Sequence, residues 1–156
     1  MRIMVVSDTH GNENALLRAY ETAGKVDLLI HLGDGEGDTG LLTDLYATPV
    51  VKVAGNCDFG STAPRELMIN IEGRQLLMTH GDRYYVKSGI ERLVNHGASS
   101  GADIVLYGHT HNPLAENNGS MLVLNPGALC LHTNRRTFAV VTLQGNTVEY
   151  IYQEVE

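Results

Sequence analysis

Residues 1–34, MRIMVVSDTHGNENALLRAYETAGKVDLLIHLGD, contain the pattern from which the fold class follows. Residues 2–8 contain the apolar run Ile3–Val6 and end in an aspartate, which is typical of a buried strand. Residues 12–24 have the apolar spacing of an amphipathic helix that ends at Gly24, and residues 26–34 repeat the buried-strand pattern. Fully apolar strands separated by a helix are typical of a parallel sheet covered by helices.

The rest of the chain first repeats the alternation of helix and buried strand, and it then contains a hairpin and a larger share of strands. A short helix is expected at residues 40–47 and a third buried strand at 50–58, followed by a hairpin over 66–82 that turns near Gly73. A helix at 88–101 precedes a strand at 102–111, and further strands are expected at residues 121–129, 137–143 and 147–153. We therefore predict an α/β fold of two packed mixed β-sheets flanked by helices, a four-layer α/β/β/α sandwich, in a single domain over residues 1–156.

The composition limits the classes of partner. The 156 residues include 11 basic and 18 acidic side chains, which gives a formal net charge of −7, and 43% of the residues are hydrophobic. Such a surface repels long nucleic acids and anionic membranes, so we expect neither as a partner. The two cysteines, Cys57 and Cys130, are too few for a disulfide framework and lack metal-site spacing. With no signal-peptide pattern at the N-terminus, we expect a cytoplasmic protein.

Five apolar runs end in side chains that can bind a metal. Ligands in open α/β sheets bind beyond the carboxyl ends of the strands, so these endings are expected to meet at one site. The last ending, His109-Thr110-His111, places two imidazoles at i and i+2, which would project from the same side of an extended segment. The candidate ligands are Asp8, His10, Asp34, Asn56, His80, His109 and His111.

These seven donors are nitrogen and oxygen groups, and they are too many for one tetrahedral ion. They suit two ions that share a bridging carboxylate, and the mixture of imidazole and carboxylate favours Mn²⁺, with Fe²⁺, Zn²⁺ or Ni²⁺ as alternatives. Two divalent ions outweigh the two negative charges of Asp8 and Asp34, so the centre would be cationic. A small phosphate ester is the expected substrate.

The ordered motifs DTH, GD, GNCD, THGD and GHTH closely resemble those of the calcineurin-like metallophosphoesterase superfamily, and in particular its small prokaryotic phosphodiesterase branch. The resemblance extends to NPGAL at residues 125–129. It implies that Asp8, His10 and His111 hold one ion, that Asn56, His80 and His109 hold the other, and that Asp34 bridges them. A bridging hydroxide would then attack phosphorus in line, with Asn56, Cys57 and His80 as catalytic residues.

Cys57 departs from the motif of many members, which have a histidine after the GN asparagine. A thiol is a weaker partner than imidazole for a departing alkoxide at neutral pH. Cysteine does occur at this position in the small phosphodiesterase branch, and the sequence supports equally a substrate-facing role and a simple turn position.

Other readings of these residues belong to different structural or functional classes. Asp8 and Asp34 could be turn or helix N-cap residues, Asn56 could cap a turn, and His31, His96 and His132 are expected to be structural. A non-catalytic protein-binding scaffold of the same fold, similar to the retromer subunit, is the alternative function. The complete ligand set favours the enzyme, a metal-dependent phosphoric ester hydrolase, and leaves its oligomeric state, including a homo-oligomer, open.

Overall fold

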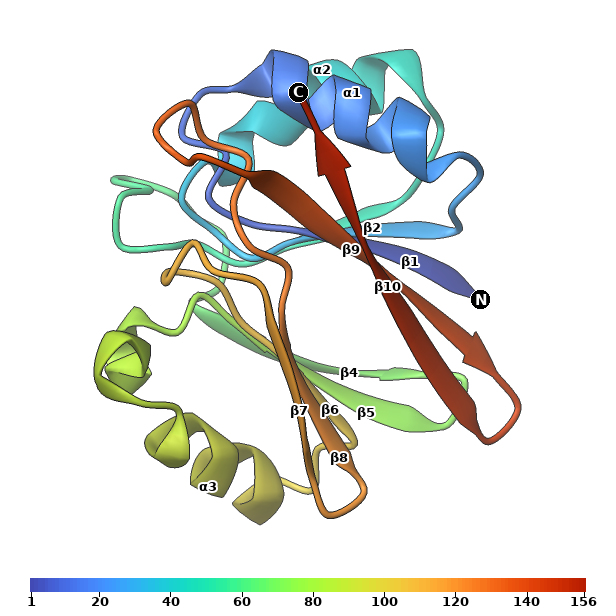
Figure 1. The fold of residues 1–156 in the computed structure, drawn as a ribbon, viewed down its shortest axis with the longest axis vertical. Coiled ribbons are helices and arrows are strands. Elements are labelled where there is room, and N and C mark those ends of the chain that lie inside the picture. The colour runs from blue at the N-terminus through green and yellow to red at the C-terminus, as the bar shows by residue number, and fades with distance from the viewer.

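The computed structural model describes residues 1–156, which fold into two β-sheets with α-helices on their outer faces (Figure 1). The strands are β1 (Arg2–Val6), β2 (Leu28–His31), β3 (Val50–Lys52), β4 (Glu66–Ile71), β5 (Arg74–Thr79), β6 (Ile104–Leu106), β7 (Leu114–Asn118), β8 (Met121–Asn125), β9 (Arg136–Gln144) and β10 (Thr147–Val155). The α-helices are α1 (Glu13–Ala23), α2 (Thr39–Leu45) and α3 (Glu91–Ser99), and short 3₁₀ helices are η1 (Glu36–Asp38), η2 (Asp82–Tyr84) and η3 (Val86–Ser88).

Both sheets are mixed. The first has the order β10-β9-β1-β2-β3, in which β1, β2 and β3 run parallel and β9 and β10 are antiparallel. The second has the order β4-β5-β6-β8-β7, in which β5, β6 and β8 are parallel and the two edge strands are antiparallel. The predicted α/β fold of two packed mixed sheets is therefore confirmed.

Side-chain alternation along the strands separates three apolar layers. Ile3 and Val5 of β1 point into the core between the two sheets, while Met4 and Val6 point to the core beneath α1 and α2. Val105 of β6 packs instead in the third core, between the second sheet and α3. Strands buried on both faces explain why the sequence shows continuous apolar runs rather than alternation.

Most of the expected elements are present, and one strand was not anticipated. The hairpin of β4 and β5 turns at Glu72 and Gly73, and α1 is capped by Asn12, whose side chain accepts a hydrogen bond from the Ala15 amide. Strand β7, with the sequence LAENN, was missed because three of its five residues are exposed and polar, and only its pairing with β8 makes it a strand. No helix of the molecule is long and apolar enough to cross a membrane.

Candidate metal centre

The strand-end side chains predicted as ligands come from both sheets. Asp8 and His10 follow β1, and Asp34 follows β2, in the first sheet. His80 follows β5, while His109 and His111 follow β6, in the second sheet. The His80 ring donates from Nδ1 to the Leu32 carbonyl oxygen at 2.8 Å, which joins the ends of the two sheets directly.

The first cluster consists of Asp8, His10 and His111. Their potential ligand atoms lie within 4.8 Å of one another. Nε2 of His111 lies 3.1 Å from Oδ1 of Asp8, and Nε2 of His10 lies 3.8 Å from the same oxygen. One carboxylate oxygen and two imidazole nitrogens therefore converge.

The second cluster consists of Asp34, His80 and His109, again with ligand atoms within 4.8 Å of one another. Nε2 of His80 lies 3.3 Å from Oδ2 of Asp34 and 3.1 Å from Nδ1 of His109. Oδ2 of Asp34 also lies 3.7 Å from Nε2 of His10, so Asp34 faces both clusters.

The backbone at these positions is unusual. Only seven residues other than glycine have a positive φ, and five of them are predicted ligands: Asp8, His10, Asp34, His109 and His111, with φ between 45° and 69°. Left-handed backbone disfavours residues with a Cβ and is concentrated at functional sites. The predicted extended segment at His109 and His111 is therefore wrong: the two rings belong to different clusters because the chain turns sharply there, not because they share one side of a strand.

Glycines before the ligands let the strand ends approach closely. A Cβ on Gly55 would lie 2.1 Å from Oδ1 of Asp34, and one on Gly108 would lie 1.9 Å from Oγ of Ser7 and 2.8 Å from Oδ2 of Asp8. None of these three distances leaves room for a side chain at the glycine position. The glycines of the GN and GH motifs are thus needed for spacing between loops.

Asp8 supplies the clearest sign of a cation site. It is fully buried, and its Oδ2 accepts hydrogen bonds from Ser7 Oγ and the His109 amide, whereas its Oδ1 has no hydrogen-bond partner. A buried carboxylate oxygen without a partner is costly unless a cation binds it. Burial by itself would raise the pKa of Asp8, but the neighbouring His111 and His80 together with the Ser7 hydrogen bond outweigh it and lower that pKa.

Asp34 is held in the ionised form that binds metals, and its charge acts on the neighbouring His80. Burial opposes ionisation of Asp34, but the His80 ring and the Cys57 amide, which donates to Oδ1 at 2.7 Å, hold its pKa well below the usual range. Burial also lowers the pKa of His80, yet Asp34 and Asp8 more than compensate and raise it. Because Nδ1 of His80 donates to Leu32, Nε2 is the ring atom left to face a metal.

The remaining two predicted site residues lie on the loop after β3. Asn56 is exposed, and its side-chain nitrogen lies 3.4 Å from Sγ of Cys57. Cys57 is also exposed, and its sulfur lies within 4.8 Å of ligand atoms of His10 and Asp34. Burial and then the neighbouring Asp34 raise the pKa of the Cys57 thiol.

The alternative structural readings of Asp8 and Asp34 as helix caps are wrong. Asn12 occupies the N-cap position of α1, and Asp38 occupies that of α2. His31 and His96 do have structural partners. His31 is buried between the Gly33 amide and Thr9 Oγ1, and His96 lies 2.9 Å from a Glu66 carboxylate oxygen.

Three further residues contact the loops that carry the candidate ligands, and none of them was among the predicted site residues. The Asp58 carboxylate accepts hydrogen bonds from the backbone amides of Asp34, Gly35, Glu36 and Gly55, so it holds the loops after β2 and β3 together. The buried Asn125 donates to the Gly108 carbonyl oxygen and to Thr110 Oγ1, and thereby supports the histidine loop. The buried Cys130 sulfur lies 3.8 Å from Nδ1 of His111.

The sequence offers a signal for two of these three residues. Asn125 belongs to the NPGAL stretch that was already linked to the site by resemblance. Asp58 lies next to the candidate ligands, a position from which it could orient them or meet the substrate, although no pattern distinguishes that role from a solvated side chain. No pattern marks Cys130.

Comparison with known proteins agrees with this geometry. The family model of the calcineurin-like phosphoesterase superfamily domain matches residues 1–146. The chain is 34% identical over 149 residues to the probable metallophosphoesterase YsnB of Bacillus subtilis, covering 94% of this chain and 86% of that protein. It is 31% identical to the phosphodiesterase YfcE of Escherichia coli K12, covering 84% of this chain and 80% of YfcE.

Solved structures show the same architecture. A conserved protein of Streptococcus pneumoniae TIGR4, described as a predicted phosphoesterase, superposes with a TM-score of 0.83 at 28% identity over 98% of this chain and 88% of that one. Vps29 of Entamoeba histolytica, in a complex with Zn²⁺, superposes with a TM-score of 0.77 over 99% of both chains. At 19% identity, this second likeness is one of fold alone.

Proposed function

The chain belongs to the calcineurin-like phosphoesterase superfamily, and from this premise we propose that it is a phosphodiesterase with a binuclear metal centre at the strand ends. The observation that carries the proposal is the position of Asp34 between two clusters of imidazole and carboxylate ligands. Asp8, His10 and His111 would hold one ion, and Asn56, His80 and His109 the other, with Asp34 as the bridge.

The donor set supports divalent transition metals. Imidazole nitrogens outnumber carboxylates in both clusters taken together, which suits Mn²⁺, Fe²⁺, Zn²⁺ or Ni²⁺ better than Ca²⁺, and Mn²⁺ is our first choice. The unpartnered Oδ1 of the buried Asp8 is the atom whose environment most requires such a cation.

When bound, two such ions supply a nucleophilic hydroxide and neutralise charge on the phosphoryl oxygens, the requirements of in-line displacement at phosphorus. Two of the protein's own side chains are already in the ionised form that binds such ions. Asp8 and Asp34 are ionised over the neutral range because their pKa values are lowered, so no proton has to be removed before ligation. Cys57, whose sulfur lies within 4.8 Å of ligand atoms of His10 and Asp34, would meet the substrate's leaving group in this proposal.

The test begins with metal content. Chelated protein reconstituted with Mn²⁺ and measured by calorimetry and elemental analysis should bind two ions per chain. Asp34→Asn should weaken both sites together because the carboxylate serves both, whereas the exposed Asp44→Asn on α2 is the matched control and should bind normally. His109→Ala and His111→Ala should each deplete a different site. Folded protein that binds no ion, or one ion, would contradict the binuclear assignment.

Hydrolysis must be measured beside metal content. Vps29 of E. histolytica shares the fold and has been crystallised with Zn²⁺, so metal binding by itself does not separate an enzyme from a scaffold. The reconstituted protein should hydrolyse bis(p-nitrophenyl) phosphate, and Asp34→Asn should lose that activity. A protein that binds two ions and hydrolyses no monoester, diester or cyclic nucleotide would favour the scaffold.

A further inference from the structure

A third group of side chains at the strand ends has the spacing of metal ligands, and it includes a cysteine. The group consists of His10, Asp34 and Cys57, whose potential ligand atoms lie within 4.8 Å of one another. Nε2 of His10 and Oδ2 of Asp34 are 3.7 Å apart. Ligand atoms that share one ion at bond lengths of about 2.0–2.3 Å lie about 3–4 Å apart, so small rotations of the exposed His10 and Cys57 side chains bring the sulfur into range.

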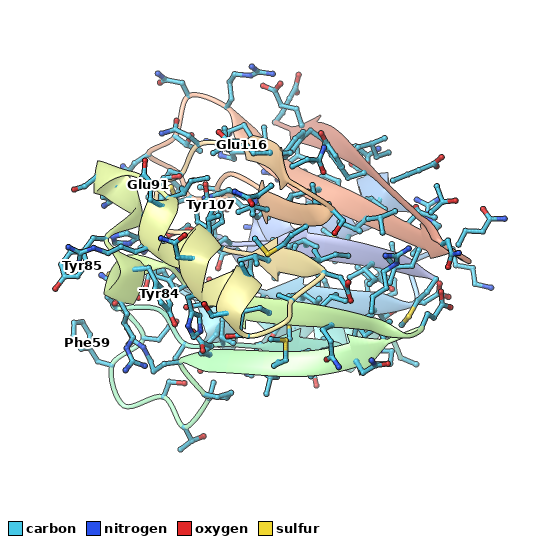
Figure 2. All side chains as sticks on the ribbon, turned by 90° about the horizontal axis from the view of Figure 1, so that it is seen from below. Phe59, Tyr84, Tyr85, Glu91, Tyr107 and Glu116 are labelled. Carbon is cyan, nitrogen blue, oxygen red and sulfur yellow. The ribbon has the colours of Figure 1, made fainter.

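Hydrogen bonds hold Cys57 at this position. Its amide donates to Oδ1 of Asp34 at 2.7 Å, so the residue is attached to the carboxylate that faces both clusters. The carboxylate of the next residue, Asp58, accepts hydrogen bonds from the amides of Asp34 and Gly55. Apolar packing contributes little to this loop, because Phe59 is 92% exposed and its ring projects from the edge of the molecule (Figure 2). Polar contacts with the candidate metal centre therefore place the thiol beside it.

The surroundings of the sulfur suit a thiolate bound to a cation. The side-chain amide of Asn56 donates to Sγ of Cys57 at 3.4 Å, and a donor in this place stabilises negative charge on the sulfur. Nε2 of His10 also lies 3.8 Å from Oδ1 of Asp8, the buried oxygen without a hydrogen-bond partner, which itself requires a cation. His10 thus connects the atom that most requires a cation with the group that contains Cys57.

Binding by the sulfur depends on the kind of ion. Thiolate ligands favour Zn²⁺, whereas Mn²⁺ prefers oxygen ligands and binds a given site more weakly than Zn²⁺ does. The other candidate ligands offer only imidazole nitrogen and carboxylate or amide oxygen. The second cysteine, Cys130, faces Nδ1 of His111, whereas Nε2 of that ring faces Asp8, so Cys130 is not placed to bind the same ion. Cys57 is therefore the group that distinguishes the two kinds of ion.

Resting on the proposed binuclear centre, we propose that Cys57 is a further metal ligand, bound through its thiolate when the ion at His10 and Asp34 is Zn²⁺ and left as a free thiol when that ion is Mn²⁺. On binding, the S–H bond breaks, the sulfur keeps the electron pair and shares it with the ion, and the proton passes to the solvent. A bound sulfur no longer meets the leaving group of the substrate. The kind of ion therefore decides whether Cys57 is a ligand or faces the substrate.

Thiol reactivity tests the ligation without any measurement of activity. In the chelated protein, a chromogenic aryl disulfide should modify the exposed Cys57 quickly and the buried Cys130 slowly. Zn²⁺ should slow the fast reaction at least about tenfold, because the electron pair that attacks the disulfide is shared with the ion. Mn²⁺ at saturation fills the same site and controls for simple shielding, so it should leave the fast reaction nearly unchanged. Equal protection by both ions, or none by Zn²⁺, would overturn the proposal.

Cobalt substitution identifies the sulfur directly. The Co²⁺-loaded wild type should show a sulfur-to-cobalt charge-transfer band in the near ultraviolet beside weaker d–d bands in the visible range. Cys57→Ser should lose the charge-transfer band and keep the d–d bands, whereas Cys130→Ala, the matched control, should keep both. Wild-type d–d bands without the charge-transfer band would overturn the ligation by Cys57 and leave the metal centre intact. Absence of both kinds of band would overturn the ligation together with the metal centre on which it rests.

Metal affinities separate a lost ligand from a damaged loop. Competition with a chromophoric chelator should show that Cys57→Ser weakens the binding of one Zn²⁺ ion at least about tenfold, since changes outside the ligand shell already cost about 10–100-fold. The affinity for Mn²⁺ should change much less, because the sulfur is not its ligand. Equal losses for both ions would mean that the substitution disturbs the loop, and an unchanged affinity for Zn²⁺ would mean that the sulfur does not bind. Either result would overturn the proposal.

Discussion

The five candidate ligands with positive φ hold a conformation that their side chains disfavour by about 1 kcal/mol or more each. The surrounding structure compensates through specific polar contacts. The Asp8 amide donates to the Gly33 carbonyl, the His10 amide donates to the Asp34 carbonyl, and the His109 amide donates to the Asp8 carboxylate. Three of the five ligands are therefore fixed by a loop that carries another ligand, which helps to order the set before any ion binds.

Cys57 gives the first prediction at this scale. Its raised pKa keeps it a neutral thiol, which is a poor proton donor to a departing alkoxide. Cys57→His should raise kcat/KM for diesters with poor leaving groups by up to about 100-fold, and should change aryl esters less. The measurement is kcat/KM against leaving-group pKa, in which a steep wild-type slope should flatten in the variant. Equal slopes in the wild type, Cys57→His and Cys57→Ala would reduce Cys57 to a turn residue.

His31 gives a pH prediction. Burial, opposed by Asp38 and other carboxylates, lowers the pKa of His31 to about 4, from about 6.5 in the unfolded chain. The ring is therefore neutral in the native state. Its contribution to the free energy of unfolding is fully present above pH 6.5. That contribution is lost as the pH falls toward 4, because the unfolded chain takes up the proton at a higher pH than the native state does. The loss should be about 3 kcal/mol.

Urea unfolding of the chelated protein between pH 7 and 4.5 tests this effect. His31→Gln should be less stable than the wild type at pH 7, since it loses either the Gly33 or the Thr9 hydrogen bond, but its stability should fall less steeply with acid. The other titrating groups are common to both proteins, so the difference between the two slopes belongs to His31. Parallel slopes would mean that the ring is protonated in the native state.

At the scale of elements, two glycines in helices separate the effect of intrinsic helix propensity from the effect of side-chain packing. Gly40 lies in α2, where a Cβ would have no other atom within 4 Å, whereas a Cβ on Gly97 of α3 would lie 2.6 Å from Val105 and 3.1 Å from Met121. Alanine is the better helix former by about 1 kcal/mol in isolation. Gly97 is therefore present because α3 must approach β6 closely.

Substituting alanine for each of these glycines should change the free energy of unfolding in opposite directions. Gly40→Ala should raise the free energy of unfolding by about 0.5–1 kcal/mol, and Gly97→Ala should lower it by about 1–3 kcal/mol because the added methyl overpacks the third core. Chemical denaturation of both variants measures this. A stabilised Gly97→Ala would show that α3 can move away from the sheet without cost.

At the scale of the whole molecule, the candidate metal centre joins two sheets. Asp8, His10 and Asp34 come from the first sheet, and His80, His109 and His111 from the second. An ion held by both sides binds only the folded sandwich, so it stabilises the sandwich by mass action. The apolar core between the sheets is otherwise their main connection.

Metal removal should therefore lower the melting temperature. At a free Mn²⁺ concentration 100 times the Kd, each site contributes about 2.7 kcal/mol, which is about 5–10 °C for a chain of this length. Thermal melts with and without chelator measure the shift. Asp34→Asn should reduce it, and Ca²⁺, which prefers all-oxygen ligands, should give a smaller shift than Mn²⁺. An unchanged melting temperature at saturating Mn²⁺ would contradict ligation across the sheets.

The sequence by itself determined the fold class and the set of strand-end candidate ligands. Apolar runs such as Leu28–Ile30 favour strands buried on both faces, and parallel strands bring their carboxyl ends to one edge of a sheet. The period of apolar residues and the polar residue that ends each run are local properties, so they can be read without knowing the packing. For the same reason β7, which has no such pattern, was missed.

The residues by themselves left open how the candidate ligands are grouped, and only the tertiary structure shows the two clusters that the family resemblance implied. His109 and His111 are two residues apart, yet one faces His80 and the other Asp8, because left-handed backbone turns them away from each other. The Asp58 carboxylate, which accepts hydrogen bonds from four backbone amides, likewise joins segments that lie far apart in the chain. Such contacts depend on distances between loops, and those distances are set by the packing of one sheet on the other, which no local pattern encodes.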